Sequence, residues 1–320
     1  MVSYKDVLKA YERISGHVHK TPVITSTTLD SLVGRQVFCK CENLQKTGSF
    51  KPRGALNAIL SLKETEPEVR GIVTHSSGNH GQAVAWAART AGLPCEVVVP
   101  NNTPKVKCDA IRGYGAELTL CERSPTSRIE TCQRISEVKG YHIVPPYDDY
   151  RVIAGQGTIA HEMLQQVPDL DAILVPISGG GMTSGIATAA KAINPNIKIY
   201  ACEAKGKELE PCLRSGERLW PNPPQFIDTI AEGIRTQQCG HLTFPILCDL
   251  IEKDVFTVTD AEMVQAMKFV FQRMKLVIEA SAGTGIAAVM SQKMRDLDPQ
   301  LRKVGVILCG GNVDIENLPW

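Results

Sequence analysis

The chain of 320 residues is about twice the length of a typical single domain, which favours two domains or one large α/β domain. Hydrophobic residues make up 43% of it and charged residues 22%, which excludes a disordered, collagen-like or coiled-coil chain. The 35 basic residues balance 34 acidic ones and no apolar run reaches the ~18 residues of a membrane span, so we expect a cytoplasmic protein that binds neither nucleic acid nor membrane.

Short runs rich in β-branched residues alternate with longer helical patterns along the chain. In chain order, the predicted strands are 38–42, 71–75, 95–100, 116–120, 141–144, 172–177, 197–203, 255–258 and 304–308. The helical patterns cover 79–91, 104–113, 125–138, 152–166, 182–193, 260–275 and 283–294, and Asp260 is the expected N-cap of the 260–275 helix. The proline-rich run 219–226 is expected to be a surface excursion. Buried strands joined by helices predict an α/β fold with mostly parallel sheets.

The 11 cysteines include no CxxC pair, which argues against a zinc ribbon or a disulfide framework. Several lie in apolar strand-like runs, such as Cys95 in CEVVVP and Cys309 in VGVILCGG. A free thiol in such a run behaves as a small buried hydrophobic side chain. We therefore expect most of the cysteines to be core thiols in a reducing compartment.

Four loops place glycines with hydroxyl, amide or amine side chains near the ends of predicted strands, where open α/β sheets bind ligands. In the first, 46–54 (KTGSFKPRG), Lys51 opens a predicted helix. The positive end of a helix disfavours an ammonium, so the Lys51 amine is biased toward the neutral nucleophile that Schiff-base chemistry needs. Taken alone, such a lysine is more often an ordinary solvated surface residue.

The second loop, 74–81 (THSSGNHG), precedes a helix and is rich in donors that can bind a carboxylate, although such a loop can also serve only as a cap. The third, 178–182 (SGGGM), has the form of a phosphate cradle but lacks the GxGxxG and Walker patterns. The fourth, 309–312 (CGGN), ends the last strand, and its alternative interpretation is a tight turn after a core thiol.

Taken together and in this order, SFKPRGA, HSSGNHG, SGGGM and CGGN resemble the motifs of the fold type II pyridoxal-phosphate enzymes, in the serine racemase and serine/threonine dehydratase family. The runs THSSGNHGQA, VIAGQGTIA and GGNVD are most similar to eukaryotic racemases of that family. The likeness covers nearly the whole chain. It implies two open, twisted, mostly parallel sheets flanked by helices, as in the tryptophan synthase β-like fold. It also implies a large cofactor-binding domain, 1–70 and 148–320, and a small mobile domain, 71–147, which carries the second loop.

The resemblance implies roles for individual residues. Lys51 would carry pyridoxal 5′-phosphate as a Schiff base and act as one base, and Ser77 would be the acid or base on the opposite face. The cofactor would be bound by Phe50, Lys51, Asn79, Gly179, Gly180, Gly181, Met182 and, beside the ring nitrogen, Cys309. The amino-acid substrate would be bound by Ser76, Ser77, Asn79, His80, Arg128 and Thr236.

These roles imply interconversion of L- and D-serine together with β-elimination of serine to pyruvate and ammonia, because both reactions begin with loss of the Cα proton. The alternative within the family is a threonine, serine or threo-3-hydroxyaspartate dehydratase with little racemase activity. Outside the family, the intact Lys51 argues against a catalytically silent amino-acid sensor. The glycine loop lacks the acidic ribose partner that a nicotinamide oxidoreductase requires.

Two features depart from the racemase pattern. A cysteine stands at 309, where serine racemases usually have serine, and neither residue holds a pyridine nitrogen protonated, so elimination should compete well. The loop 145–150 (PPYDDY) is more similar to the dehydratases and lacks the serine run of related aspartate racemases. Its Asp148 and Asp149 are expected near the entrance, where they would disfavour a dicarboxylic substrate.

Relatives in the family also bind Mg²⁺ or Ca²⁺ through a glutamate, a main-chain carbonyl and a second acidic side chain. Glu203 matches the glutamate, but Lys207 and Leu209 stand at the other two positions, so Glu208 or Glu210 would have to supply the acid. The resemblance further implies a homodimer that binds ATP with magnesium at its interface as an allosteric activator. The matching polar or basic residues are Ser26, Thr27, Lys46, Thr47, Gln82, Tyr114, Lys275 and Asn312.

Overall fold

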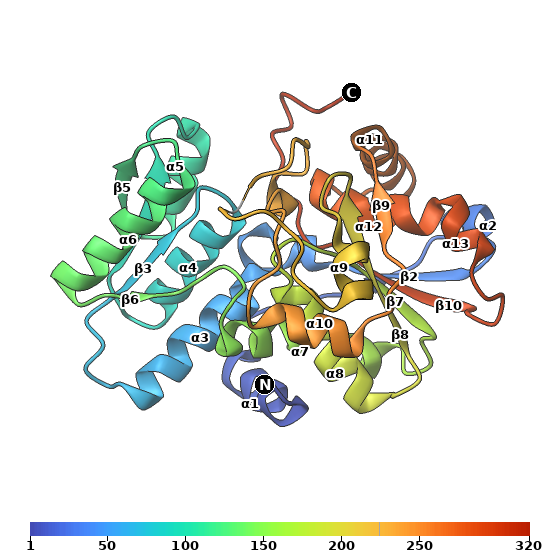
Figure 1. The fold of residues 1–320 in the computed structure, drawn as a ribbon, viewed down its shortest axis with the longest axis horizontal. Coiled ribbons are helices and arrows are strands. Elements are labelled where there is room, and N and C mark those ends of the chain that lie inside the picture. The colour runs from blue at the N-terminus through green and yellow to red at the C-terminus, as the bar shows by residue number, and fades with distance from the viewer. Residues whose placement is uncertain (224) are drawn as a thin grey trace.

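The structure is a computed structural model that describes residues 1–223 and 225–320, and its strands form two sheets (Figure 1). The larger sheet has the order β1-β2-β10-β7-β8-β9. Its strands are β1 (Val23–Ile24), β2 (Gln36–Lys40), β7 (Ala172–Pro176), β8 (Lys198–Ala204), β9 (Phe256–Val258) and β10 (Lys303–Ile307). The short β1 runs antiparallel to β2, and the other neighbours are parallel.

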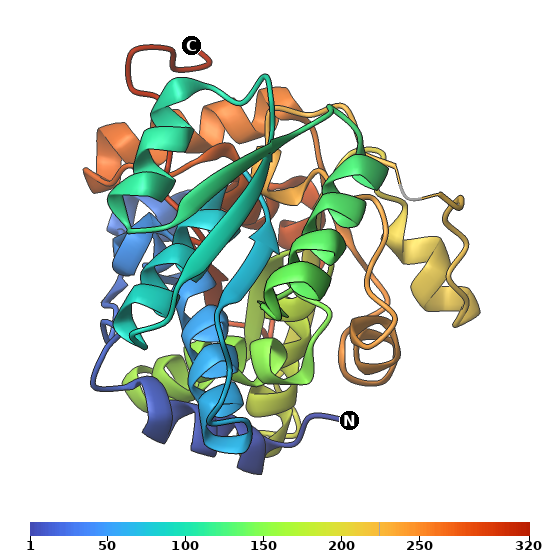
Figure 2. The ribbon, with the colours of Figure 1, turned by 90° about the vertical axis from the view of Figure 1, so that its left-hand side faces the viewer.

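The smaller sheet has the order β5-β4-β3-β6, and its strands are all parallel. They are β3 (Ile72–His75), β4 (Cys95–Pro100), β5 (Glu117–Cys121) and β6 (His142–Ile143), which follow one another in the chain between β2 and β7. Figure 2 shows this sheet toward the viewer, with the larger sheet behind it. Two mostly parallel sheets flanked by helices confirm the predicted fold class.

Helices cover both sheets. They are α1 (Tyr4–Ile14), α2 (Thr27–Val33), α3 (Lys51–Thr65), α4 (Asn79–Thr90), α5 (Lys105–Gly113), α6 (Pro125–Lys139), α7 (Tyr150–Gln166), α8 (Gly181–Ile193), α9 (Leu209–Ser215), α10 (Thr243–Leu250), α11 (Asp260–Phe269), α12 (Ala280–Met290) and α13 (Gln292–Asp296). Short helical turns are η1 (Glu42–Leu44), η2 (Lys46–Gly48), η3 (Glu232–Ile234) and the π-helical η4 (Val270–Met274). In the described part of the chain, no helix is long and apolar enough to cross a bilayer.

Two local predictions need correction. Thr259, not Asp260, caps α11, since its hydroxyl accepts from the Glu262 N–H while the Glu262 carboxylate accepts from the Thr259 N–H. Asp260 instead accepts from the Thr229 hydroxyl. The predicted 283–294 helix is divided into α12 and α13, because Ser291 has an extended backbone and caps α13. Most described residues of the proline-rich run 219–226 are exposed, as expected, and residue 224 lies outside the described residues.

Helix α3 connects the two parts of the molecule, because it packs on α4 on one side and on α7 on the other. Its Leu56 and Ile59 are fully buried in the same hydrophobic cluster as Val84 and Val97, which belong to the smaller sheet and its helix α4. The larger sheet has its own core, formed mainly by β7, β8, β10, α8 and α12. The first residue of α3, Lys51, is therefore held by an element that contacts both cores.

Candidate active site

Lys51 is positioned by the first turn of α3, directly after Phe50. Its Nζ donates a hydrogen bond to the carbonyl oxygen of Pro146 at 2.8 Å. Desolvation lowers the pKa of the amine to about 8, although the nearby Cys309 and Glu279 raise it. About a tenth of the amine is then neutral at pH 7, far more than for an ordinary lysine, and the neutral amine is the form that attacks an aldehyde.

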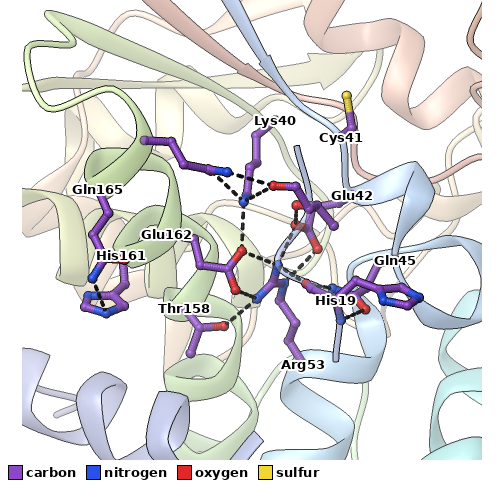
Figure 3. A network of polar contacts seen from close by, with 12 residues as sticks. His19, Lys40, Cys41, Glu42, Gln45, Arg53, Thr158, His161, Glu162 and Gln165 are labelled. Carbon is purple, nitrogen blue, oxygen red and sulfur yellow. Dashed lines mark hydrogen bonds and ion pairs between the residues drawn. The ribbon is translucent and has the colours of Figure 1, made fainter. Parts of the chain in front are cut away.

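A buried ion network fixes the start of α3 two residues beyond Lys51 (Figure 3). The fully buried guanidinium of Arg53 binds the carboxylates of Glu42 and Glu162, each through contacts of 2.8–2.9 Å. The buried ammonium of Lys40 binds Glu162 at 2.8 Å. Two cations and two carboxylates balance in charge, and η1, β2 and α7 are thereby tied to α3.

The first and fourth loops lie against each other. The main-chain N–H of Phe50 donates to the Cys309 carbonyl at 3.0 Å, and Ser49 forms a β-bridge with Gly310. The Cys309 thiol is buried, and burial raises its pKa well above the ordinary value, so it stays a neutral S–H. The structure therefore brings together Lys51, Phe50 and Cys309, which the family resemblance implies to be cofactor-binding residues.

The second loop comes from the smaller sheet and begins α4. Gly81 allows its tight turn, because a Cβ there would lie 2.1 Å from the Ser76 carbonyl oxygen. The Ser76 hydroxyl accepts from the Gly78 N–H at 3.3 Å, and Ser77 is part-buried in the same turn. The hydroxyl groups of Ser76 and Ser77 therefore lie in the turn before α4, next to the first main-chain N–H groups of that helix.

His80 is a neutral residue of this loop. Burial, together with the nearby charge of Lys51, lowers its pKa to about 3. Its Nε2 lies 3.0 Å from the Val144 carbonyl oxygen and must donate to it, which leaves Nδ1 as a buried acceptor with no partner among residues 1–223 and 225–320. The imidazole thus has no free N–H for a substrate carboxylate, so the main-chain N–H is what His80 can offer.

Asn79 is held from two sides. Its Nδ2 donates to both carboxylate oxygens of Glu279, at 3.1 and 3.0 Å, and its Oδ1 accepts from Asn312 Nδ2 at 2.8 Å. Glu279 is buried directly before α12, and desolvation raises its pKa. Sequence reasoning missed Glu279; its only signal is that it is a lone carboxylate in the otherwise uncharged run VIEASAGTG.

The third loop leads into α8. Gly180 has φ +95° and precedes the helix, and the Gly179 carbonyl accepts from Gly240 N–H at 3.0 Å and from the Thr243 hydroxyl at 2.7 Å. The Tyr147 ring packs so closely on Gly179 that a Cβ there would lie 2.4 Å from it. Sequence reasoning assigned no role to Tyr147. Gly181 and the buried Met182 begin α8, and the Thr183 hydroxyl nearby is buried with no hydrogen-bond partner in the described part of the chain.

These donors fit pyridoxal phosphate. The first N–H groups of α8, which have no acceptor within the helix, and the Thr183 hydroxyl suit a phosphate group. The amine of Lys51 suits an aldehyde, and the aromatic ring of Phe50, 5.0 Å from Lys51 Nζ, suits the face of a pyridine. The residues that the four loops bring together therefore match the predicted cofactor.

Arg128 and Thr236 lie around one aromatic ring. The Arg128 guanidinium in α6 is 5.2 Å from the Phe226 ring centroid, and that of Arg235 is 5.9 Å from it. Thr236 pairs with Phe226 in a β-bridge. Neither arginine forms an ion pair with a carboxylate among the residues that the structure describes.

Asp148 and Asp149 both bind donor groups of the protein, and the expected repulsion of a dicarboxylic substrate stays a prediction. The Asp148 carboxylate accepts from the main-chain N–H groups of 241–243 at 2.9–3.3 Å and so caps the start of α10. Asp149 caps α7 and forms an ion pair with Arg151 at 2.7 Å, which lowers its pKa although burial opposes this. Both charges are satisfied within the protein.

The residues proposed for a divalent cation do not meet. Glu203 is buried and accepts from Leu209 N–H and the Thr257 hydroxyl. Glu210 instead binds Arg214 and the Val255 N–H, while Glu208 is exposed. In the described ranges, no group of three His, Cys, Asp or Glu side chains is suited to a metal ion. The expected oxygen set is therefore not formed.

The residues predicted for ATP lie on several elements. Asn312 Nδ2 donates to the Thr47 carbonyl at 2.8 Å, which joins two of them. Ser26 caps α2, and the Lys275 ammonium binds the Gln272 carbonyl. The others are Thr27 in α2, Lys46 in η2, Gln82 in α4 and Tyr114 at the end of α5.

Comparisons with known proteins agree with this geometry. The family model described as "Pyridoxal-phosphate dependent enzyme" matches residues 14–310. A serine racemase from Dictyostelium discoideum is 46% identical over 99% of this chain and 97% of its own. A crystal structure of a pyridoxal 5′-phosphate-dependent aspartate racemase has a TM-score of 0.97 and 58% identity, covering 100% of this chain and 98% of its own. A threonine deaminase from Solanum lycopersicum has a TM-score of 0.88 and 30% identity, over 98% and 90% of the two chains.

Both racemases are similar to this chain over nearly all of its length. The match of the family model spans the elements that carry Lys51, the glycine loop and Cys309. The chain therefore belongs to the family of pyridoxal-phosphate dependent enzymes.

Proposed function

We propose that the protein interconverts L- and D-serine and also converts serine to pyruvate and ammonia. The observation that carries the proposal is the environment of Lys51, a shielded amine whose pKa is lowered to about 8. It begins a helix that contacts both cores, so groups from the two sheets can act on one substrate. The likeness to serine racemases over nearly the whole chain supports serine as the substrate.

When bound, pyridoxal phosphate withdraws electrons from the substrate Cα and makes its proton acidic. Because the Lys51 pKa lies near neutral pH, its Nζ is able both to accept and to return that proton on one face. The Ser77 hydroxyl exchanges the proton on the opposite face. The Ser76 hydroxyl and the first N–H groups of α4, including those of Asn79 and His80, orient the substrate carboxylate.

The remaining residues hold the cofactor. The N–H groups of Gly179, Gly180, Gly181 and Met182 bind its phosphate at the start of α8. The Cys309 thiol, kept protonated by burial, is a neutral neighbour of the ring nitrogen. A neutral thiol would leave a bound cofactor a weaker electron acceptor than an aspartate would, so elimination is expected to compete well with racemisation.

Two variants test this assignment. With L-serine, the native enzyme is expected to form D-serine and pyruvate, Ser77→Ala pyruvate only, and Lys51→Ala neither product, while circular dichroism shows both variants folded. Chiral chromatography and a pyruvate assay measure the products. Ser31→Ala, an exposed serine in α2, is the control. Formation of D-serine by Ser77→Ala at the native rate would refute the role of Ser77.

A second candidate function is racemisation of aspartate, which the 58% identical aspartate racemase structure favours. Arg128 and Arg235 lie around Phe226 without ion-pair partners in the described chain, and a second substrate carboxylate would suit them. Asp148 and Asp149 cap helices, and their expected repulsion of a dicarboxylic substrate would act against it. The same chromatography with L-aspartate decides: D-aspartate formed faster than D-serine would replace serine as the preferred substrate.

We also propose, from the family resemblance, a cytoplasmic homodimer that ATP with magnesium activates. The polar contact between Thr47 and Asn312, next to Asn79, offers a route from such a site to α4. Light scattering tests the dimer, and calorimetry with serine kinetics tests the nucleotide. A monomer, or unchanged kinetics without binding heat, would remove the corresponding part of this proposal.

We further propose that residues 71–147 move as a small domain on the large one, 1–70 and 148–320. The contacts across this boundary include an ion pair between Lys107 in α5 and Glu232 in η3. Helix α3 stays with the large domain and packs into the core of the smaller sheet, so its contact with α4 is where the two parts are expected to move against each other. Small-angle scattering with and without substrate tests the movement, since a rigid molecule would give identical curves.

A further inference from the structure

Lys207 is a lysine whose whole side chain is buried, in the loop between β8 and α9. Its Nζ donates to two main-chain carbonyl oxygens, those of Thr236 at 3.1 Å and Gln237 at 2.8 Å. The Trp220 ring centroid lies 5.5 Å from the same nitrogen. Carbonyl oxygens and an aromatic face are the surroundings that proteins give to a bound cation.

The loop around Lys207 also supplies a negative charge. The Glu203 carboxyl group is buried four residues before Lys207, where it accepts hydrogen bonds from the Leu209 N–H and the Thr257 hydroxyl. The Cys239 thiol nearby has its pKa raised by burial to about 11 and stays neutral. Lys207 therefore provides the positive charge beside a buried carboxyl group.

Lys207 is held along its whole length. Its carbonyl oxygen accepts from the Trp220 indole N–H at 2.6 Å, while its ammonium grips the 236–237 segment. The side-chain amide of Gln237 returns a hydrogen bond to the Gly206 carbonyl at 3.1 Å. Two separate segments, 203–209 and 236–237, are thus joined around one nitrogen atom.

The segment that the ammonium holds, 236–237, leads to residues that contact the third loop, 178–182. This loop, proposed above to bind the cofactor phosphate, is called the phosphate loop below. Gly240 follows Gln237 by three residues, and its N–H donates to the Gly179 carbonyl at 3.0 Å. The Cys239 thiol lies 3.6 Å from the Ser178 carbonyl oxygen. A displacement of 236–237 would therefore move the residues that support the glycines before α8.

We propose that Lys207 is a built-in cation that takes the place of the divalent metal ion expected beside Glu203, and that it positions the 236–240 segment against the phosphate loop. The residues that would complete a metal shell are used otherwise, since Leu209 is apolar and Glu210 binds Arg214. A tethered ammonium is present in every molecule. Folding and cofactor binding then need no Mg²⁺ or Ca²⁺, whichever amino acid is the substrate.

The first test uses the native holoenzyme. Its melting temperature, its retention of pyridoxal phosphate on dialysis and its serine turnover are expected to be the same with EDTA as with added Mg²⁺ or Ca²⁺, in the absence of nucleotide. A fall in melting temperature with EDTA that either ion reverses would overturn the proposal. This test does not require any variant to fold.

The second test removes the ammonium. Lys207→Ala leaves two carbonyl oxygens and the Glu203 carboxylate without their cation, so the melting temperature should fall by roughly 5–10 °C and cofactor should be lost on dialysis. Ca²⁺ or Mg²⁺ should then raise the melting temperature of this variant, though not of the native protein. Lys205→Ala, an exposed lysine of the same loop, is the matched control and should behave as the native protein does.

The outcomes of the second test separate the proposal from a purely structural role. If Lys207→Ala is as stable as the Lys205→Ala control, Lys207 is not a required cation and the proposal is wrong. If Lys207→Ala is destabilised but no cation restores it, the pocket is not a cation site and the proposal also fails. Both readings are independent of activity, so failure of the proposed racemase function would not affect them.

Discussion

Asn79 at the start of α4 and Glu279 directly before α12 are joined by two hydrogen bonds, from the amide Nδ2 to Oε1 at 3.1 Å and to Oε2 at 3.0 Å. The pair connects the second loop, which comes from the smaller sheet, to a helix that packs on the larger one. The Glu279 charge also raises the pKa of the Lys51 amine, against the larger effect of desolvation. One buried carboxyl group therefore acts on a proposed cofactor contact and on the proposed base.

The native apoprotein is expected to take up pyridoxal phosphate covalently at a rate that rises with pH around a midpoint near 8. Only the neutral amine attacks an aldehyde, and the lowered pKa of Lys51 makes it neutral above about pH 8. An ordinary lysine, with a pKa of about 10.4, would give a rate still rising at much higher pH. Stopped-flow absorbance measures the rate, and a midpoint above pH 10 would contradict the prediction.

Glu279→Gln is expected to move that midpoint to lower pH. The variant loses the charge that stabilises the Lys51 ammonium, so the amine becomes neutral more readily. In the variant, one of the two carboxylate oxygens that accept from Asn79 Nδ2 is replaced by an NH₂ group. Since an NH₂ group is only a donor, Asn79 loses one of its two hydrogen bonds to residue 279. Glu130→Gln, an exposed change in α6, is the control. An unchanged or higher midpoint would mean that Glu279 does not act on Lys51.

The four loops could be predicted from the sequence because each is a local signal. In the second and third loops, a strand, a glycine-rich turn and a helix start follow one another within a few residues, and the fourth loop directly follows the last strand. The position of Lys51 at a helix start is equally local. The contact between Phe50 and Cys309 is not, since the two residues come from opposite ends of the chain, and only the family resemblance predicted it.

Residues that act through distant partners were missed or misjudged. Glu279 belongs to no motif, and it matters because it accepts a hydrogen bond from Asn79, which is 200 positions away in the sequence. Asp148 and Asp149 are visible in the sequence, but the N–H groups that donate to Asp148 belong to 241–243. The sequence places Lys207 at a position of the expected cation site, but it does not show the carbonyl groups that the Lys207 ammonium binds.

Arg53→Met is expected to destabilise the protein by about 3–5 kcal/mol, because it leaves the buried carboxylates of Glu42 and Glu162 with too little positive charge. Since Arg53 fixes the first turn of α3, the variant should also lose affinity for pyridoxal phosphate at Lys51. Urea unfolding and cofactor titration measure the two effects.

Lys105→Ala is the control for this change, because it breaks an exposed ion pair with Asp109 on α5. Such a pair contributes little in water, and neither stability nor cofactor affinity should change measurably. If Arg53→Met were as stable as Lys105→Ala, the network of Figure 3 would not be what holds the start of α3.

His80 is expected to make the protein less stable in mild acid. Its folded-state pKa of about 3 lies below the value of about 6.5 for a free histidine, so between these limits the unfolded chain binds a proton that the folded protein cannot. Above about pH 6.5 both states are neutral and His80 has no effect on the pH dependence. As the pH falls below that value, this one residue lowers the free energy of unfolding by about 1.4 kcal/mol per pH unit.

Below about pH 6.5, His80→Gln should therefore lose stability less steeply than the native protein. The two slopes of unfolding free energy against pH should differ by at most the contribution of one bound proton. The amide of glutamine is able to replace the Nε2–H that donates to the Val144 carbonyl, so the comparison changes titration more than hydrogen bonding. Urea unfolding at several pH values gives the slope for each protein, and the slope, unlike the absolute stability, is insensitive to the packing cost of the substitution. His17→Gln, an exposed change after α1, is the matched control. Equal slopes for the native protein and His80→Gln would mean that His80 gains a proton while folded. The conclusion that His80 is neutral in the site, with Nδ1 as an acceptor, would then be wrong.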